Sequence, residues 1–188
     1  MPIPPAAFRQ PLRRRFAVAA ALALAASLVA MPFEAAAQNP VRGTGLPLPR
    51  FVSLKSDEVN VRRGPGEQYE VAFKFVKEGL PVEITQEFDT WRKIRDSEGA
   101  EGWVYHSLLS GKRTALVAPW ETSGNTGPYA AHSAPEPASA VVAYLAPKVV
   151  AEVEECGGGW CLISGRGYRG WIEQERLWGV YPNEEFEE

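Results

Sequence analysis

Apolar and polar residues alternate in two separate parts of the chain. Residues 80–86 read Leu-Pro-Val-Glu-Ile-Thr-Gln, and residues 149–154 read Val-Val-Ala-Glu-Val-Glu. Alternation of this kind, bounded by turn residues, predicts half-buried β-strands. Further strands are predicted at 91–95 and 102–105, joined by a turn at 96–99. No segment after residue 37 has the apolar spacing of an amphipathic helix.

The order of these features occurs twice. Each alternating segment is followed by a tryptophan, by an isoleucine three residues later, and by a Gly-Trp-aliphatic triplet. These residues are Trp91, Ile94 and 102–104 in the first copy, and Trp160, Ile163 and 170–172 in the second. The copies are offset by 68 to 70 residues, and the changes of offset fall in predicted turns, where insertions are tolerated. We interpret the chain as a duplicated unit of about 60 residues.

Each copy therefore contains about five short strands, and so small a sheet must curl on itself to bury a core. The fold class we predict is all-β, with two tandem small β-barrels.

The first copy carries a more specific set of motifs. Residues 59–66 read Val-Asn-Val-Arg-Arg-Gly-Pro-Gly, and Tyr69, Val71, the Leu-Pro-Val of the next strand, Trp91 and the Gly-Trp-Val triplet follow in order. In this order and spacing, residues 51–111 resemble the bacterial Src-homology-3-like (SH3-like) domain of cell-envelope proteins. Copy two, about 129–178, keeps the later half but has Tyr-Ala-Ala-His-Ser-Ala-Pro in place of the first-loop signature. The resemblance implies SH3-like barrels and a cell-wall or peptide ligand.

We expect the first barrel at 50–113 and the second, divergent barrel at 114–181. Residues 114–120 are expected to contain the first strand of the second barrel, and 121–128 to form a loop. The acidic residues 182–188 are expected to form a solvated, frayed tail.

The first 37 residues have a different character. Arg9 and Arg13-Arg14-Arg15 precede 18 uncharged residues, 16–33, and three alanines follow at 35–37. This is the layout of a secretory signal peptide. The alternative is a membrane anchor, since about 18 residues is near the minimum for a spanning helix. The alanine-rich composition, a late proline and the Ala-x-Ala site favour cleavage, so we expect a periplasmic protein without stable membrane insertion.

Charge excludes one class of partner. After residue 37 the chain carries 16 basic and 22 acidic residues. Residues 50–113 are balanced at 11 of each sign, whereas residues 129–188 carry 4 basic and 10 acidic residues. Nothing forms a basic stripe for a phosphate backbone, so nucleic acid is not an expected partner.

The two cysteines, Cys156 and Cys161, flank a four-residue hairpin loop. Opposed positions at the foot of a hairpin are close enough to bridge, and export permits oxidation. The corresponding residues of copy one are Glu87 and Arg92, an opposite-charge pair suited to cross-strand contact. We predict a structural Cys156–Cys161 disulfide; the alternatives are a reactive thiol, a redox pair or a zinc site, and the chain is short of four zinc ligands.

Catalysis has no clear candidate. His106 and His132 lie at or near predicted turns, as do Asp57, Asp89 and Asp96, where aspartate is common for backbone reasons. We therefore predict that the protein is not an enzyme and has no catalytic residue, metal site or cofactor.

The aromatic residues are the best candidates for ligand contact. Trp91 begins a strand directly after a loop, where an indole is half exposed, and Tyr69 and Tyr105 are placed to complete a groove. The alternatives are rim packing for Trp91 and loop anchoring for the two phenols. Trp103 and Trp171 are interpreted as core residues because each lies inside a strand.

Copy one is expected to bind and copy two to support it. Gly64 and Gly66 permit loop conformations that the corresponding Ala134 and Glu136 resist. The sequence thus predicts a non-catalytic, exported tandem SH3-like module that recognises cell-wall glycopeptide, peptide or an envelope protein. The alternatives are a targeting or regulatory subunit of a cell-wall hydrolase, or a structural envelope protein without a ligand.

Overall fold

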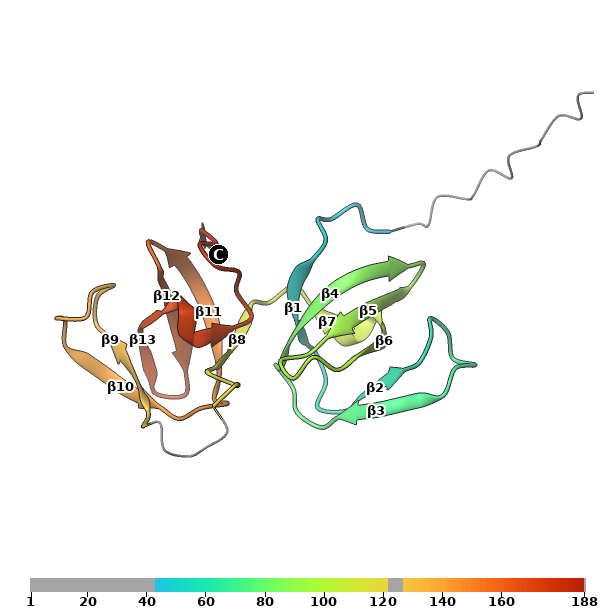
Figure 1. The fold of residues 1–188 in the computed structure, drawn as a ribbon, viewed down its shortest axis with the longest axis horizontal. Coiled ribbons are helices and arrows are strands. Elements are labelled where there is room, and N and C mark those ends of the chain that lie inside the picture. The colour runs from blue at the N-terminus through green and yellow to red at the C-terminus, as the bar shows by residue number, and fades with distance from the viewer. Residues whose placement is uncertain (1–42, 122–126, 188) are drawn as a thin grey trace, which may run out of the picture. The chain divides into compact units, whose positions relative to one another are not determined.

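The computed structural model describes residues 43–121 and 127–187 (Figure 1). Both copies belong to one compact unit, Gln38–Glu188. The expected signal peptide at 1–37 and most of the expected loop at 121–128 lie outside the described residues. Within the described ranges, no helix has both the length and the apolar character needed to cross a bilayer.

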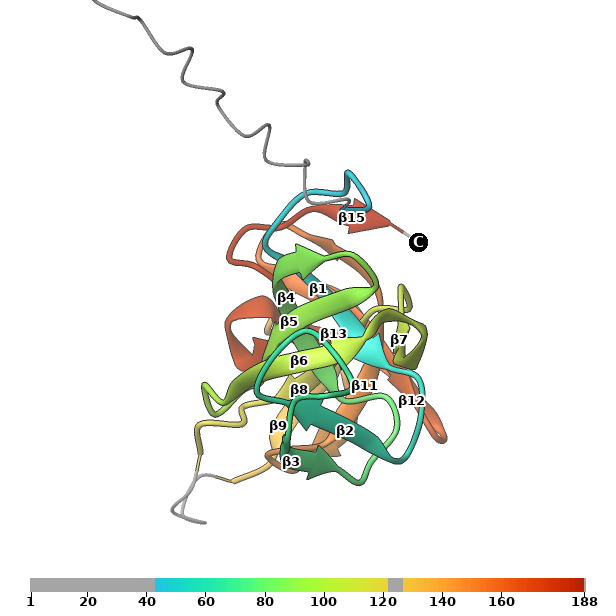
Figure 2. The same cartoon turned by 90° about the vertical axis from the view of Figure 1, so that its right-hand side faces the viewer.

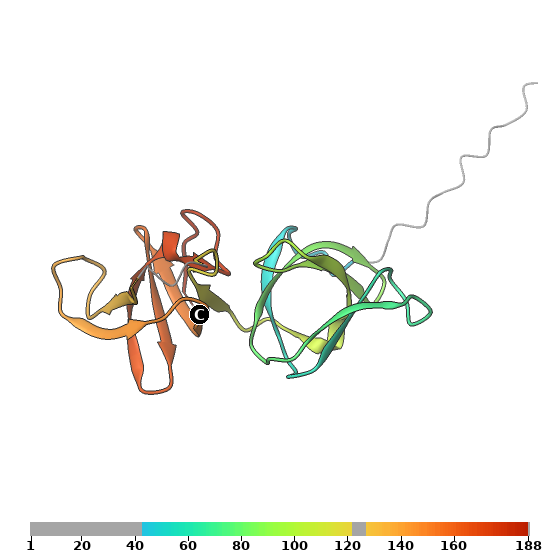
Figure 3. The ribbon, with the colours of Figure 1, turned by 60° about the horizontal axis from the view of Figure 1, so that its bottom comes forward.

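Copy one forms a seven-stranded antiparallel sheet that curls around its own core (Figures 2 and 3). The strand order is β3-β2-β6-β5-β4-β1-β7, and a 3₁₀ turn, His106–Leu108, follows β6. The strands are β1 Arg50–Leu54, β2 Val59–Arg62, β3 Val71–Phe75, β4 Pro81–Phe88, β5 Trp91–Arg95, β6 Glu101–Tyr105 and β7 Leu109–Ser110.

Copy two repeats this arrangement, with the order β10-β9-β13-β12-β11-β8-β14. Its strands are β8 Thr114–Val117, β9 Tyr129–His132, β10 Val141–Leu145, β11 Val150–Gly157, β12 Trp160–Gly165, β13 Tyr168–Glu173 and β14 Leu177–Trp178; β15 Phe186–Glu187 pairs with β11. A 3₁₀ turn, Gln174–Arg176, again follows the equivalent strand. The predicted all-β fold of two tandem SH3-like copies is confirmed, and β8 is the first strand in the sheet of copy two.

Aliphatic residues fill both cores. In copy one Val59, Val61, Val82, Ile94 and Val104 are fully buried. Copy two has a corresponding cluster that also contains both cysteines. The alternating segments predicted from sequence supply these residues, because every second side chain of a strand faces inward.

Each sheet curls where its second strand crosses β6 or β13. Arg62 pairs with Trp103 at this crossing, and His132 pairs with Trp171 in copy two. A Cβ at Gly102 would strike the Val61 side chain and lie 2.8 Å from the carbonyl oxygen of Arg62. A Cβ at Gly170 would lie 2.9 Å from the carbonyl oxygen of His132. The glycine of the repeated Gly-Trp pair is therefore required by this close backbone approach.

The interpretation of Trp103 and Trp171 as core residues is wrong. Both side chains are only half-buried, whereas Val104 and Ile172 beside them are buried. Successive side chains of a strand point to opposite faces of the sheet. Because Gly102 and Val104 face inward, Trp103 faces outward.

The first loop has the same backbone in both copies despite its different sequence. Its three backbone hydrogen bonds recur at an offset of 70: Arg63 to Glu70, Gly66 to Gly64 and Tyr69 to Gly66 in copy one, and Ser133 to Ala140, Glu136 to Ala134 and Ser139 to Glu136 in copy two. The side-chain anchor recurs too. Arg62 donates to the carbonyl oxygen of Tyr69 at 2.7 Å, and His132 Nδ1 lies 3.2 Å from that of Ser139.

Gly64 is needed for space, and neither glycine of this loop is needed for backbone freedom, which corrects the sequence interpretation. Neither Gly64 nor Gly66 adopts a positive φ. A Cβ at Gly64 would instead lie 2.5 Å from the ring of Tyr69. Copy two has Ala134 and the small Ser139 at these two positions, so the methyl group is accommodated.

One hairpin position is held by different chemistry in each copy. Cys156 and Cys161 form the predicted disulfide, with Cα atoms 4.1 Å apart on paired positions of β11 and β12. The equivalent Glu87 and Arg92 are paired across β4 and β5, with the ion pair at 3.2 Å. All four side chains are buried.

The carboxylate of Glu87 is held by several donors. It also accepts hydrogen bonds from Arg50 at 2.5 Å and from the Thr44 hydroxyl at 2.8 Å. Burial opposes the ionised form of Glu87. Hydrogen bonds from Arg50 and Thr44 and the charge of Arg92 outweigh burial, and the pKa falls from 4.5 to about 2.

The expected frayed tail is only partly correct. Glu185 and Glu187 are exposed, but Glu184 forms two 2.9 Å hydrogen bonds with Arg113. Phe186 packs against the core of copy two and lies in β15. The sequence interpretation rested on the four glutamates of this segment. It did not take account of Phe186, the aromatic residue that anchors the segment to copy two.

We expect reduction of the disulfide to loosen copy two without unfolding copy one. A loop this short gains about 2 kcal/mol from cross-linking in the loop-entropy account. Amide hydrogen exchange should accelerate in β11 and β12 after reduction, while exchange in β4 and β5 stays constant. Equal acceleration in both hairpins would contradict separate anchoring.

The corresponding copy-one hairpin should respond to pH. The pKa of Glu87 is about 2 in the folded protein and near 4.5 in the unfolded chain, so its contribution is complete above pH 4.5 and declines as the pH falls toward 2. We expect Glu87→Gln to cost about 1–2 kcal/mol at neutral pH, allowing for solvent screening. The difference in unfolding free energy between wild type and variant should shrink below pH 4.5. A pH-independent difference would show that the ionised carboxylate is not what stabilises the hairpin.

Replacing the Gly64–Tyr69 pair of copy one with the Ala–Ser pair of copy two should restore stability that Gly64→Ala alone loses. Gly64→Ala should cost about 1–3 kcal/mol because the methyl group has no room beneath Tyr69. The double variant Gly64→Ala/Tyr69→Ser, which reproduces the copy-two pair, should recover part of this loss in thermal unfolding. Ala134→Gly serves as the control and should cost less. A double variant no more stable than Gly64→Ala would refute the steric explanation.

Candidate functional site

Three aromatic side chains form a row on the outer surface of copy one. Phe88, Trp91 and Tyr105 occupy directly paired positions on β4, β5 and β6. The rings of Trp91 and Tyr105 meet edge to face with centroids 5.6 Å apart, and His106 lies 4.9 Å beyond Tyr105. Phe88 is 48% exposed and Tyr105 is 39% exposed. We call Phe88, Trp91 and Tyr105 the aromatic row.

A second line of side chains runs beside the aromatic row. Lys93 pairs with Trp103, and Trp103 pairs with Arg62, so these residues share the outer face of β5, β6 and β2. Lys93 contacts Glu101 at 2.6 Å. The hydrogen bond and the charge of Lys93 lower the pKa of Glu101. At neutral pH the charges of Lys93 and Glu101 offset each other.

The three candidate residues from the sequence are only partly brought together. Trp91 and Tyr105 are in contact. Tyr69 lies on the loop between β2 and β3, where its ring covers Gly64 and 43% of the residue is exposed. Arg62 joins this loop to the face, because it bonds the Tyr69 carbonyl and pairs with Trp103.

Sequence reasoning missed Phe88 and Trp103 as members of this surface. The signal for Trp103 was present, since it precedes Tyr105 by two positions and strand side chains repeat their facing every second residue. Assigning Tyr105 to the surface and Trp103 to the core was internally inconsistent. Phe88 gave no comparable signal, because a register shift between β4 and β5 changes the count along this strand.

Copy two lacks a complete row. The positions of Phe88, Trp91 and Tyr105 are occupied by Gly157, Trp160 and Glu173 in the same register. Trp160 packs instead against His132, with ring centroids 5.6 Å apart.

The described residues contain no cluster of three or more His, Cys, Asp or Glu side chains arranged to hold a metal ion. Both cysteines are joined in the disulfide, which excludes the thiol-nucleophile and zinc-thiolate alternatives for the oxidised protein.

Comparison with known proteins gives one curated relative. The chain is 29% identical over 126 residues to a protein described as "Putative N-acetylmuramoyl-L-alanine amidase YrvJ" from Bacillus subtilis (strain 168), and the match covers 65% of this chain and 24% of that protein. The chain thus spans about a quarter of the length of this relative.

Among solved structures, NlpC1 and NlpC2 from Trichomonas vaginalis each match with a TM-score of 0.31 and 14% identity. These matches cover 72% and 69% of this chain, and 47% and 48% of the respective structures.

The family profile described as "Bacterial SH3 domain" matches residues 55–111 and 127–179, one segment in each curled sheet. Since these segments make up more than half of the chain, the protein belongs to the bacterial SH3 domain family, as two tandem copies.

Proposed function

We propose that the protein is a non-catalytic binding module of the bacterial cell envelope, and that copy one holds cell-wall glycopeptide on the aromatic row with Trp103 and Tyr69 beside it. The observation that carries this proposal is the aromatic row itself. Three paired aromatic side chains across three strands expose flat apolar surface that the fold does not use for its core. Exposed apolar patches of this kind are typical of binding sites.

The charge of the surface fits a ligand of this class. Lys93 and Glu101 neutralise each other, so aromatic planes and a few polar groups remain for contact. Such surfaces bind extended chains by stacking and by hydrogen bonds at their edges. A relative described as an N-acetylmuramoyl-L-alanine amidase supports cell-wall material as the ligand.

The remaining parts of the proposal follow from the same observations. Export through cleavage of residues 1–37 would place the protein in the periplasm, where its disulfide is stable and the wall is accessible. Copy two, with Gly157 and Glu173 in place of two aromatic rings, would support copy one without a row of its own.

We expect Trp91→Ala to weaken co-sedimentation with purified peptidoglycan about 5-fold to 30-fold, the usual cost of removing an aromatic anchor. The melting temperature should change little, because Trp91 lies outside the core cluster. Trp103→Ala should also weaken binding, since Trp103 faces outward.

Trp160→Ala is the matched control in copy two and should sediment like the wild type. Loss of binding in Trp160→Ala with full binding in Trp91→Ala would reverse the roles of the copies. Full binding in all three variants would remove the aromatic row from the site.

A further inference from the structure

The first strand of each copy is buried on both of its sides. All positions of β8 and four of the five of β1 are buried, although only alternate residues can face their own core. The other side of β1 contacts copy two: the Phe51 ring lies 5.2 Å from that of Trp178 and 4.8 Å from that of Tyr181. The two copies therefore pack against each other through corresponding strands.

Corresponding positions of the two copies have diverged at this contact. Phe51 pairs with Glu83 in copy one, and Thr114 pairs with Glu152 in copy two. The register gives four equivalences: Thr114 for Phe51, Glu152 for Glu83, Ser164 for Arg95 and Ser110 for Trp178. One half of the contact is thus built from rings and an Arg–Glu pair, and the other half from small hydroxyl side chains.

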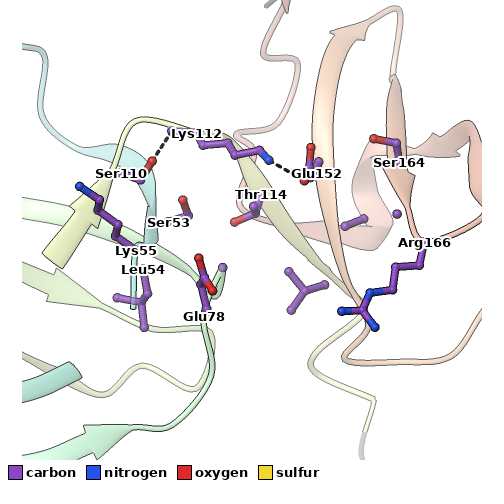
Figure 4. A pocket seen from close by; sticks show the side chains of 14 residues that line it. Ser53, Leu54, Lys55, Glu78, Ser110, Lys112, Thr114, Glu152, Ser164 and Arg166 are labelled. Atoms are coloured by element: carbon purple, nitrogen blue, oxygen red, sulfur yellow. Dashed lines mark hydrogen bonds and ion pairs between the residues drawn. The ribbon is translucent and has the colours of Figure 1, made fainter. Parts of the chain in front are cut away.

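The hydroxyl half contains a cavity of about 570 Å³ (Figure 4). Its size falls in the range of small-molecule and peptide sites. Ser110, Thr114 and Ser164 line it, and Lys112 crosses one side to bond Glu152 at 2.5 Å. In the first half of the contact, Phe51 packs against Trp178. At the equivalent positions of the second half, the smaller side chains of Thr114 and Ser110 leave a cavity with polar walls.

Thr114 shows that the cavity is equipped for a polar ligand. Its side chain lies between Ser53 and Glu152 in Figure 4, and the residue is 5% exposed. Its hydroxyl oxygen has no hydrogen-bond partner among the residues that the structure describes. A buried hydroxyl left in this state costs about 1–3 kcal/mol, and a ligand that bonds it recovers that cost.

Charged side chains flank the hydroxyls. Lys55, Glu78 and Arg166 line the cavity, and within the described ranges none of the three forms an ion pair. With Lys112 and Glu152 neutralising each other, two cations and one carboxylate remain available. A multiply charged anion such as phosphate would be repelled by Glu78, whereas a molecule with separated carboxylate and ammonium groups matches both signs.

We propose that this cavity binds a short peptide with free termini. Arg166 takes its carboxylate, Glu78 takes its ammonium group, and the Thr114 hydroxyl bonds its backbone. Lys55 lies on the other side of Glu78 from Arg166 (Figure 4) and is not assigned a contact. The site is separate from the aromatic row and does not rest on the function proposed for that surface.

Isothermal titration of the full chain with trialanine tests the proposal. We expect weak binding, with a Kd on the order of 1 mM. Amidation of the trialanine carboxyl terminus should weaken binding, and inorganic phosphate should not compete. Absence of trialanine binding, equal binding of the amide, or competition by phosphate would overturn the proposal.

Two variants locate the site. Arg166→Gln should weaken trialanine binding at least about 5-fold, and Thr114→Val about 3-fold to 10-fold, the worth of one hydrogen bond. Thr114→Val should leave the melting temperature unchanged or raise it, because it removes an unpartnered hydroxyl. Arg63→Gln, which removes a 71% exposed arginine side chain of the first loop, is the matched charge control and should bind normally. Normal binding by Arg166→Gln, or equal losses in Arg166→Gln and Arg63→Gln, would place the peptide elsewhere.

Discussion

The close approach of β2 to β6, and of β9 to β13, is the constraint on which each copy depends. A sheet of this size buries a core only by curling, and its second strand meets the sheet at a single pair of residues, Arg62 with Trp103 or His132 with Trp171. Only glycine fits at the neighbouring position. Because a strand alternates its facing, an inward glycine directs the next tryptophan outward. The closure of the fold thereby places Trp103 on the same surface as Trp91 and Tyr105.

The two copies stabilise equivalent positions with different side-chain chemistry. The hairpin that ends β4 is held by a buried ion pair, and its counterpart by a disulfide. The first loop keeps one backbone path with Gly64 beneath Tyr69 or with Ala134 beside Ser139. Since the frame persists through these exchanges, the outer surfaces of the copies were free to diverge, and only copy one carries three paired aromatic side chains. The contact between the copies diverged in the same way, with rings in one half and hydroxyl groups in the other.

The sequence predicted the parts of the structure that follow from local periodicity. Period-two alternation located the strands, and the repeat located the equivalent positions, including Cys156 with Cys161. The sequence also predicted correctly that Trp91 and Tyr105 lie on one surface. It did not predict features that depend on contacts between distant residues. The ring of Tyr69 above Gly64, the ion pair of Arg113 with Glu184 and the polar cavity beside Thr114 all join residues whose proximity no spacing rule shows. The error at Trp103 differs in kind, because alternation contained the answer and the usual burial of tryptophan outweighed it.

The central claim is that ligand contacts the outer aromatic surface of copy one. Indole N–H signals in a two-dimensional proton–nitrogen NMR spectrum test this claim directly, because each tryptophan gives its own resonance. On titration with soluble peptidoglycan fragments, the resonances of Trp91 and Trp103 should shift while those of Trp160 and Trp171 stay in place. Shifts confined to Trp160 and Trp171, or no shift at any tryptophan, would contradict the account.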